Sequence, residues 1–263
     1  MFQYRKFTEL IKIIAHLRSP NGCPWDKAQT HKSIVKNLIE ESFELVDAIE
    51  NDDVLNTKEE LGDVLLQVML HSQIAADNKS FSIDDVVEEL GKKLVRRHPH
   101  VFGDKQARTE EEAHQSWLDA KALETDKNKK NTDAFNIPKH LPPLAFAQKI
   151  GRKMGKEDFD WNNNQQVIQK IKEELLECTE ALKEPSANPN PHLKEEIGDL
   201  LFITCQFARH NNIQADEALR GANKKIEKRY FQAKNLAQKD NHPWQSLSLD
   251  KKESYWQQVK SLK

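Results

Sequence analysis

Apolar residues along this chain recur at the spacing of helices. Five of them follow the i, i+3, i+4, i+7, i+8 series of one helical face: Leu61, Val64, Leu65, Val68 and Met69. A similar segment later in the chain contains Leu200, Leu201, Ile203 and Phe207. The stretch VLLQVML at 64–70 is apolar almost all round, which predicts a helix at the centre of a bundle. No convincing period-2 strand pattern is present, so the sequence predicts an all-α fold.

Polar residues mark the expected ends of these helices. Ser82 and Asp85 form a capping-box-like start, which predicts a helix from there through Arg97. His98 and Pro99 follow, and proline disfavours a continuing helix. Turns are predicted at 51–53 and at 185–191.

The chain repeats itself once when residues 34–121 are laid over residues 168–260. Four patterns recur in the same order: 40–44 on 173–177, 59–63 on 195–199, 93–97 on 225–229, and 117–121 on 256–260. The step from Glu40 to Lys93 is matched within one residue by the step from Glu173 to Lys225. A duplication explains this order better than chance. Each copy is predicted to contain three to five helices.

The segment between the copies is polar and lysine-rich, then proline-rich, as linkers are. We therefore predict an N-terminal helical domain at 1–124, a linker at 125–143 and a C-terminal helical domain at 144–263.

Composition narrows the class of protein. A formal net charge of -2 gives no electrostatic reason to expect nucleic-acid or membrane binding. Neither GxGxxG nor GxxxxGK[ST] occurs, and the chain has only 8 glycines, so the phosphate loops of α/β nucleotide folds are not expected.

The cysteines and the N-terminus bear on the compartment. Cys23, Cys178 and Cys205 are odd in number and far apart, which favours a reducing compartment over a disulfide framework. The first ten residues contain no apolar leader segment, and no apolar run approaches the roughly 18 residues of a membrane span. We expect a cytoplasmic protein.

Acidic residues three apart form the candidate metal site. Glu41 and Glu44, like Glu60 and Asp63, share a helical face, and two antiparallel helices joined by a short turn bring such faces together. The second copy offers the matching set Glu174, Glu177, Glu196 and Asp199. Four converging carboxylates repel one another unless a hard divalent cation lies between them, and oxygen ligands favour Mg²⁺ or Mn²⁺.

Two other interpretations of these acids fit the sequence less well. In a chain with 31% charged residues, a lone EExxE is usually a solvated helix face, but here the acidic pair abuts the most apolar helix and the arrangement occurs twice. A di-iron bundle needs paired ExxH motifs, and the chain has only Glu111 to His114.

Cations and tryptophans recur at helical spacing beside the acids. These pairs, each four residues apart, are Lys93 and Arg97, Lys225 and Arg229, Trp117 and Lys121, and Trp256 and Lys260. Lysine and arginine bind phosphate oxygens, and an indole can stack on a base. Each pair alone is more often an ordinary surface or core feature. Together with the acids they predict a site for a nucleoside triphosphate.

In combination these motifs resemble the MazG family of all-α nucleoside triphosphate pyrophosphohydrolases. Two further blocks are similar to that family, NGCPWDKAQT at 21–30 and RRHPHVF at 96–102. The resemblance spans nearly the whole chain and includes the duplication. It implies two tandem MazG-like helical bundle domains, a homodimer, and hydrolysis of NTPs or dNTPs between the α and β phosphates.

The resemblance also implies roles for residues in both copies. Metal would be held by Glu41, Glu44, Glu60 and Asp63, and by Glu174, Glu177, Glu196 and Asp199. Nucleotide would be contacted by Lys225, Arg229, Trp256 and Lys260, mirrored by Lys93, Arg97, Trp117 and Lys121.

The mechanism expected from this site is metal-assisted phosphoryl transfer. Glu40 and Glu173, the first acids of each box, are the candidate catalytic residues that orient water or hold a second ion. The second copy has Asp158-Phe-Asp-Trp161 in place of the NGCPWDKAQT block, so the copies are expected to differ, with the second the more essential site.

Two alternatives stay open from the sequence. One is a more selective enzyme of the same carboxylate type, such as a dimeric dUTP pyrophosphatase. The other is a non-enzymatic helical interaction protein whose acidic faces bind basic partners. Nucleic-acid binding is disfavoured by the near-neutral charge.

Overall fold

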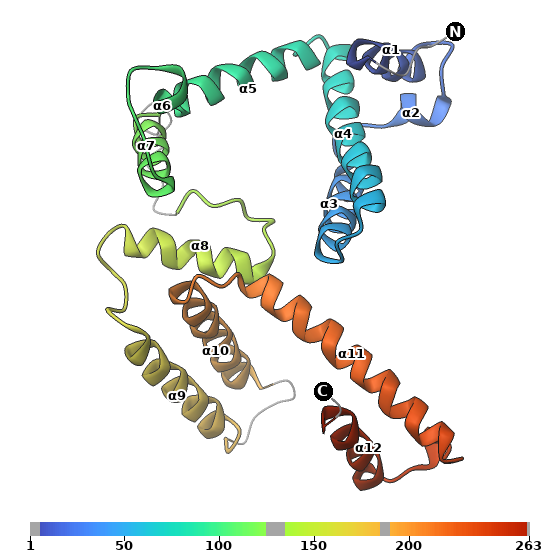
Figure 1. Ribbon diagram of the computed structural model, residues 1–263, viewed down its shortest axis with the longest axis vertical. Helices are drawn as coiled ribbons and strands as arrows, with labels where there is room; N and C mark the ends of the chain where they lie inside the picture. Colours follow the sequence, from blue (N-terminus) through green and yellow to red (C-terminus); the bar gives the residue numbers. More distant parts are fainter. Residues whose placement is uncertain (1–5, 125–134, 185–189, 262–263) are drawn as a thin grey trace. The chain divides into compact units, whose positions relative to one another are not determined.

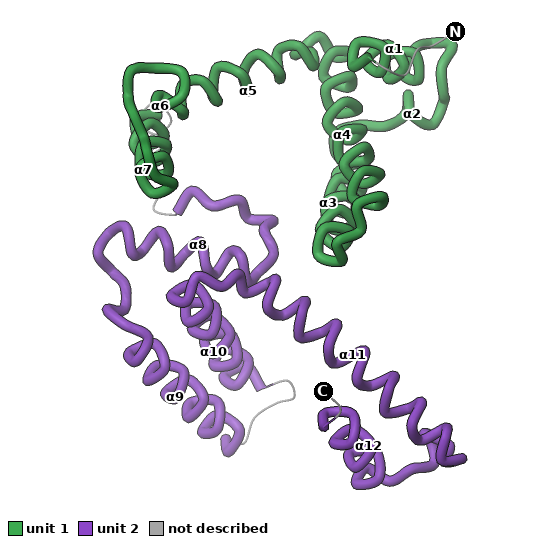
Figure 2. The backbone as a smooth tube through the Cα atoms, in the orientation of Figure 1, with its two compact units in different colours: residues 1–130 green, residues 131–263 purple. Residues whose placement is uncertain are grey.

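The computed structural model describes residues 6–124, 135–184 and 190–261, and within these ranges the chain forms helices and no strand (Figure 1). This confirms the predicted all-α fold. The chain divides into two compact units, residues 1–130 and residues 131–263 (Figure 2).

The first unit is built around one long apolar helix, α4. Its described helices are α1 (Phe7–Arg18), α2 (Pro24–Ala28), α3 (Val35–Glu50), α4 (Val54–Asp77), α5 (Ile83–Arg97), α6 (Pro99–Phe102) and α7 (Glu110–Ala122). Helix α4 packs against α1, α3 and α5, as expected of a central helix. Its Met69, Leu70 and Ile74 form a buried core with Ile14 of α1 and with Ile34.

The second unit has its apolar contacts in two places. Its described helices are α8 (Pro143–Gly155), α9 (Asn164–Ala181), α10 (Pro191–His210), α11 (Ala215–Lys239) and α12 (Leu249–Ser261), with a short 3₁₀ turn at Trp244–Ser246. Helix α10 packs against α8 and α9. A separate small core joins α11 to α12 through Ala233, Ala237, Tyr255 and Val259.

Local sequence signals correctly predicted several helix ends and turns. Ser82 caps α5 with the reciprocal hydrogen bonds of a capping box with Asp85, and α5 ends at Arg97 before His98 and Pro99. The turn at 51–53 is present, with Asp52 in the left-handed region at φ 54°. The predicted turn at 185–191 and the linker at 125–143 fall partly outside the described residues, which resume at 190 and 135.

The prediction of three to five helices in each copy is confirmed for the described residues, since α3 to α7 lie in the first copy and α9 to α12 in the second. Two helices of the first unit are very short: α2, with five residues, precedes the first copy, and α6, with four, lies within it. Each begins with a proline, Pro24 or Pro99, at a position where the missing N–H costs nothing. Segments this short are below the length at which apolar periodicity can be read.

Many apolar side chains on these helices remain exposed within one chain. Helix α5 buries none of its residues, and Val87, Leu90 and Leu94 are each about half exposed. Ile39 and Phe43 of α3 are similarly exposed. Among the described helices, none is both long enough and apolar enough to cross a membrane.

Candidate active site

In the first copy, the antiparallel pair α3 and α4 brings three carboxylates together. One oxygen each of Glu41, Glu44 and Glu60 lies within 4.8 Å of the others. The short turn after α3 and the N-cap of α4, where Asp53 accepts a hydrogen bond from the Asn56 N–H at 3.0 Å, set this register. Asp63, one turn beyond Glu60, lies outside this triad but close enough to act on its charge.

The environment of Glu60 fits a bound cation. Its side chain is buried, and its Oε2 atom has no hydrogen-bond partner. Burial, followed by the neighbouring acids, raises the pKa of Glu60, and the same causes raise the pKa of Glu41. A buried anion with a free oxygen among other anions is costly, and a divalent cation with oxygen ligands would remove that cost.

In the second copy, α9 and α10 form the equivalent cluster. One oxygen each of Glu174, Glu196 and Asp199 lies within 4.8 Å of the others. Glu174 is buried. Glu177 is not in this triad, but burial and a hydrogen bond with Glu174 raise its pKa. The structure therefore brings together three predicted ligands in each copy, and they differ in one position.

Two basic residues of the second cluster were not predicted. Lys170 Nζ lies 2.6 Å from Glu173 and 2.7 Å from Glu174, and these hydrogen bonds raise the pKa of the lysine. His192 Nε2 lies 3.0 Å from Glu196. Both pairs have the i, i+4 or i, i+3 spacing of one helical face, a signal that the sequence does contain. The first copy has Asn37 where the second has Lys170.

Three of the four predicted nucleotide residues of the first copy meet where α5 packs against α7, and the fourth, Lys93, lies one turn earlier on α5. The Arg97 guanidinium lies over the Trp117 ring at 5.5 Å, and Lys121 Nζ lies 4.7 Å from the same ring centre. The Arg97 guanidinium is already paired with Glu124. Arg97 donates to the Oε2 atom of Glu124 from Nε at 3.1 Å and from Nη2 at 2.5 Å. Arg96 donates to its Oε1 at 2.6 Å.

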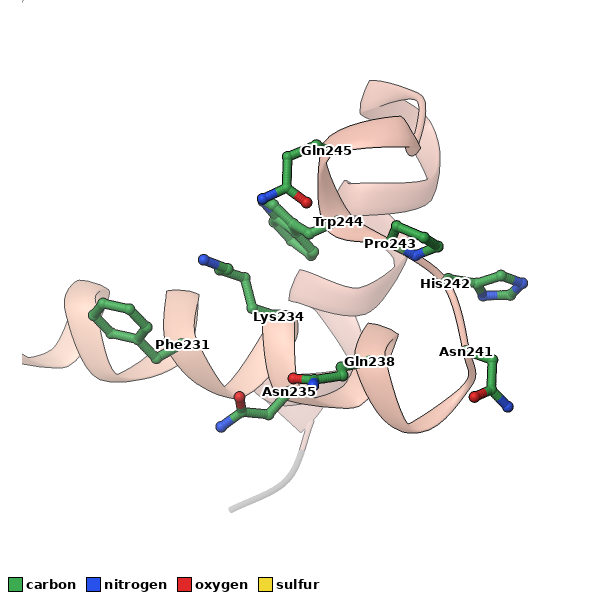
Figure 3. Close-up of a pocket in the computed structure, with 9 residues that line it drawn as sticks. All are labelled: Phe231, Lys234, Asn235, Gln238, Asn241, His242, Pro243, Trp244 and Gln245. Carbon is green, nitrogen blue, oxygen red and sulfur yellow. The ribbon is translucent and has the colours of Figure 1, made fainter.

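The predicted nucleotide residues of the second copy lie on α11 and α12. Lys225 and Lys260 are exposed, while Arg229 and Trp256 are half-buried. Further along α11 is a pocket of about 610 Å³ formed with the segment before α12, lined in part by Lys234, Gln238 and Trp244 (Figure 3). It contains none of the predicted site residues.

Within one chain, the carboxylates and the nucleotide residues lie on different helix pairs. In the first unit the acids lie on α3 and α4, while Arg97, Trp117 and Lys121 lie where α5 meets α7 (Figure 1). In the second unit the acids lie on α9 and α10, and the cations on α11 and α12. Among the described residues, no hydrogen bond or ion pair joins a predicted ligand carboxylate to a predicted nucleotide-binding side chain of its own copy.

Comparisons with known proteins agree with this duplicated arrangement. The MazG nucleotide pyrophosphohydrolase domain matches residues 29–102 and again residues 162–232. The nucleoside triphosphate pyrophosphohydrolase/pyrophosphatase MazG of Thermotoga maritima is 43% identical, covering 97% of this chain and 95% of that protein. The nucleoside triphosphate pyrophosphohydrolase of Escherichia coli K12 is 36% identical, covering 95% of each chain.

One solved structure is also similar over part of the chain. It is the crystal structure of a MazG-related protein from Thermotoga maritima, at 26% identity and a TM-score of 0.38. The similarity covers 44% of this chain and 98% of that one.

Proposed function

This chain belongs to the MazG family of nucleotide pyrophosphohydrolases, and it is a hydrolase of nucleoside triphosphates; from that premise we propose its metal, its cleavage site and its assembly. We propose that it is magnesium-dependent and cuts NTPs and dNTPs between the α and β phosphates, releasing a monophosphate and pyrophosphate. The observation that carries the proposal is the carboxylate triad formed in each copy, with an unpartnered buried oxygen on Glu60.

The residues that would hold the metal are the acids of the two helix pairs. In the first copy these are Glu41, Glu44, Glu60 and Asp63, and in the second Glu174, Glu177, Glu196 and Asp199. When bound, magnesium offsets the charge of the phosphate oxygens and makes its water more acidic. Manganese has the same ligand preference and is expected to substitute.

The remaining residues bind, orient and hold protons. Glu40 and Glu173, the first acids of each box, orient the attacking water and accept its proton. Lys225 and Arg229 donate to the pyrophosphate leaving group, and Trp256 with Lys260 contacts the rest of the nucleotide, as do Lys93, Arg97, Trp117 and Lys121 in the first copy. Lys170 pairs with Glu173 and Glu174 and offsets part of their charge.

We further propose that the enzyme is a homodimer in which a second copy of the chain completes each site. The support is the separation of acids from nucleotide residues within one chain. Exposed apolar side chains on α3 and α5 offer a surface for that second copy. Clusters of exposed apolar side chains are typical of protein–protein interfaces. Its cytoplasmic location stays a prediction.

The first test is product analysis with a panel of NTPs and dNTPs, with and without magnesium. We expect monophosphate and pyrophosphate only when the metal is present. Diphosphate and orthophosphate would contradict the cleavage site. Turnover of dUTP alone would favour the selective pyrophosphatase, and no turnover of any nucleotide would favour the interaction protein.

The second test removes one carboxylate charge from each cluster. Glu174→Gln and Glu41→Gln each remove one carboxylate charge from a triad, and we expect the double variant to lose turnover while helical content stays unchanged. Glu180→Gln is the matched control, because Glu180 is an exposed acid of α9 outside the triad. Full activity of the double variant would show that these carboxylates do not hold the metal.

A further inference from the structure

Three buried polar atoms without a partner lie on one stripe of α4. Among the described residues, the buried side-chain nitrogens and oxygens that lack a hydrogen bond are Glu60 Oε2, Gln67 Oε1 and His71 Nε2. At about 100° per residue, these positions fall within roughly 40° of arc around the helix. Unpaired buried polar atoms are rare and each is costly, so three on one stripe indicate a missing ligand that contacts all of them.

The stripe has a charged end and a neutral end. Glu60 belongs to the carboxylate triad, which is the phosphate end of the proposed site. Gln67 lies two helical turns further on, about 10 Å along the axis, and His71 one turn beyond it, about 6 Å. A nucleotide has the same order of groups, with a phosphate, a sugar and then a flat base with a polar edge.

His71 already contacts one nitrogen heterocycle, His31, through its other ring nitrogen. The Nδ1 atoms of the two imidazoles lie 2.8 Å apart, with 9° between the ring planes and 5.2 Å between ring centres. The rings therefore meet through their nitrogen edges, as two paired bases do. Burial and the nearby His31 lower the pKa of His71, which keeps this ring neutral. His31 thus occupies Nδ1 of His71, and Nε2 is the ring nitrogen left for a ligand.

The second copy does not keep these polar groups. By the alignment of the two copies, Gln67 corresponds to Ile203 and His71 to Phe207. The equivalent helix pair of the second copy, α9 and α10, thus forms with apolar residues at the positions of Gln67 and His71. Packing alone does not require a glutamine at position 67, and its buried amide needs a functional reason.

We propose that Gln67 and His71 form a base-binding subsite of the first copy that selects bases with an amino group next to a ring nitrogen. In the orientation that the structure shows, the Gln67 amide oxygen is the unpartnered atom and can accept from the amino group of adenine or cytosine, while the amide nitrogen donates to the adjacent ring nitrogen. Hypoxanthine and uracil present an oxo group beside a ring N–H, which pairs at two points only with an amide rotated by 180°. The inference rests on the proposed function, because the triad at Glu60 must bind the phosphate end.

The test measures binding of monophosphates, which are products and are not consumed. The full chain carries Glu174→Gln to weaken the second copy, and AMP, IMP, CMP and UMP are titrated by calorimetry with magnesium present. We expect AMP to bind about tenfold tighter than IMP, and CMP about tenfold tighter than UMP, which is the discrimination of one good amide–base pair. Adding Gln67→Leu should bring both ratios close to one.

Controls keep the result specific. Gln73→Leu makes the same change on the same helix, but Gln73 donates to Asp77 at 2.8 Å and lies off the stripe, so the ratios should not change. If Gln67→Leu does not fold, Gln67→Met replaces the amide with a side chain of similar length. His71→Phe, the residue of the second copy, should weaken binding of AMP and CMP severalfold.

The inference and the proposed function fail in different ways. Equal binding of AMP and IMP, no binding of any monophosphate, or ratios unchanged by Gln67→Leu would overturn the subsite and assign the free atoms to buried water. Release of pyrophosphate from ATP by the unaltered chain tests the proposed function separately. A chain that hydrolyses ATP without this discrimination keeps the function and loses the inference.

Discussion

Single residues make the two copies unequal. In the second copy, Lys170 and His192 pair with acids of the cluster, whereas Glu60 of the first copy has an unpartnered buried oxygen. The proposed nucleotide residues show the opposite difference. Arg97 of the first copy already forms an ion pair with Glu124. The corresponding position after Trp256 is Lys263 in the sequence. The second copy therefore pairs its metal-site acids with basic residues, whereas the first copy pairs its phosphate-site arginine with an acid.

Removing the charge of Glu124 should strengthen anion binding in the first copy. The carboxylate contacts Arg97 and Arg96 as a phosphate would, and these pairs lower the pKa of Glu124 to about 2, so it is ionised at neutral pH. We expect Glu124→Gln, in a chain that also carries Glu174→Gln, to bind pyrophosphate severalfold tighter in calorimetric titrations.

The control is Glu89→Gln, which removes an exposed acid of α5. It should leave pyrophosphate affinity unchanged. Equal affinities for the Glu124 and Glu89 variants would mean that Arg97 does not bind the anion.

At the scale of helices, the sequence predicted what local interactions determine. The ends of α5 follow from Ser82, Asp85 and Pro99, and the approach of Glu41 to Glu60 follows from i, i+3 spacing and a short turn. The contact of Glu124 with Arg97 could not be predicted, because it depends on how α7 meets α5 across 27 residues. For the same reason, the separation of acids from cations within one chain was visible only in the fold.

The connection of α8 to α9 is held to α10 by one carboxylate. Asp160 accepts two hydrogen bonds from Arg209, at 2.8 and 2.7 Å, and one from His210 at 2.9 Å. The Arg209 side chain is 12% exposed and that of Asp160 is 25% exposed, so solvent screens the pair little. This is the segment that replaces the NGCPWDKAQT block of the first copy.

Asp160→Asn should destabilise the second unit in a pH-dependent way. The hydrogen bonds from Arg209, with that of His210, lower the pKa of Asp160 well below its ordinary value of 3.8. A lowered folded-state pKa stabilises the fold above the unfolded value, and that stability is lost as the pH falls through the folded value. We expect a loss of about 2 kcal/mol at neutral pH, which is typical of hydrogen bonds to charged groups.

Thermal melts of the unaltered chain and of the variant, taken from about pH 7 down to about pH 2, check this sign. The difference in Tm should be largest at neutral pH and should shrink below about pH 4. A difference that stays constant over the whole range would assign the effect to packing rather than to the charge of Asp160.

At the scale of the whole molecule, each unit has its own apolar contacts and yet leaves apolar stripes uncovered. Val87, Leu90 and Leu94 follow i, i+3, i+7 on α5, and each is about half exposed. Helix α5 has none of its residues buried, although it connects the acid-bearing pair to Arg97 and Trp117. A helix of this kind is stable when a second chain covers the stripe, which agrees with the proposed homodimer.

Charges on that stripe should separate the dimer and stop catalysis together. We expect the unaltered chain to scatter light with twice the chain mass of 30.5 kDa, and Leu90→Glu with Leu94→Glu to scatter as a single chain. Hydrolysis should fall with the loss of the dimer, because the acids of one chain then lack the cations of the other. Lys92→Glu, which places a new acid on an exposed position of the same helix, should keep both mass and activity, since its ion pair with Glu88 is exposed. A monomer that retains full activity would show that one chain assembles the site alone.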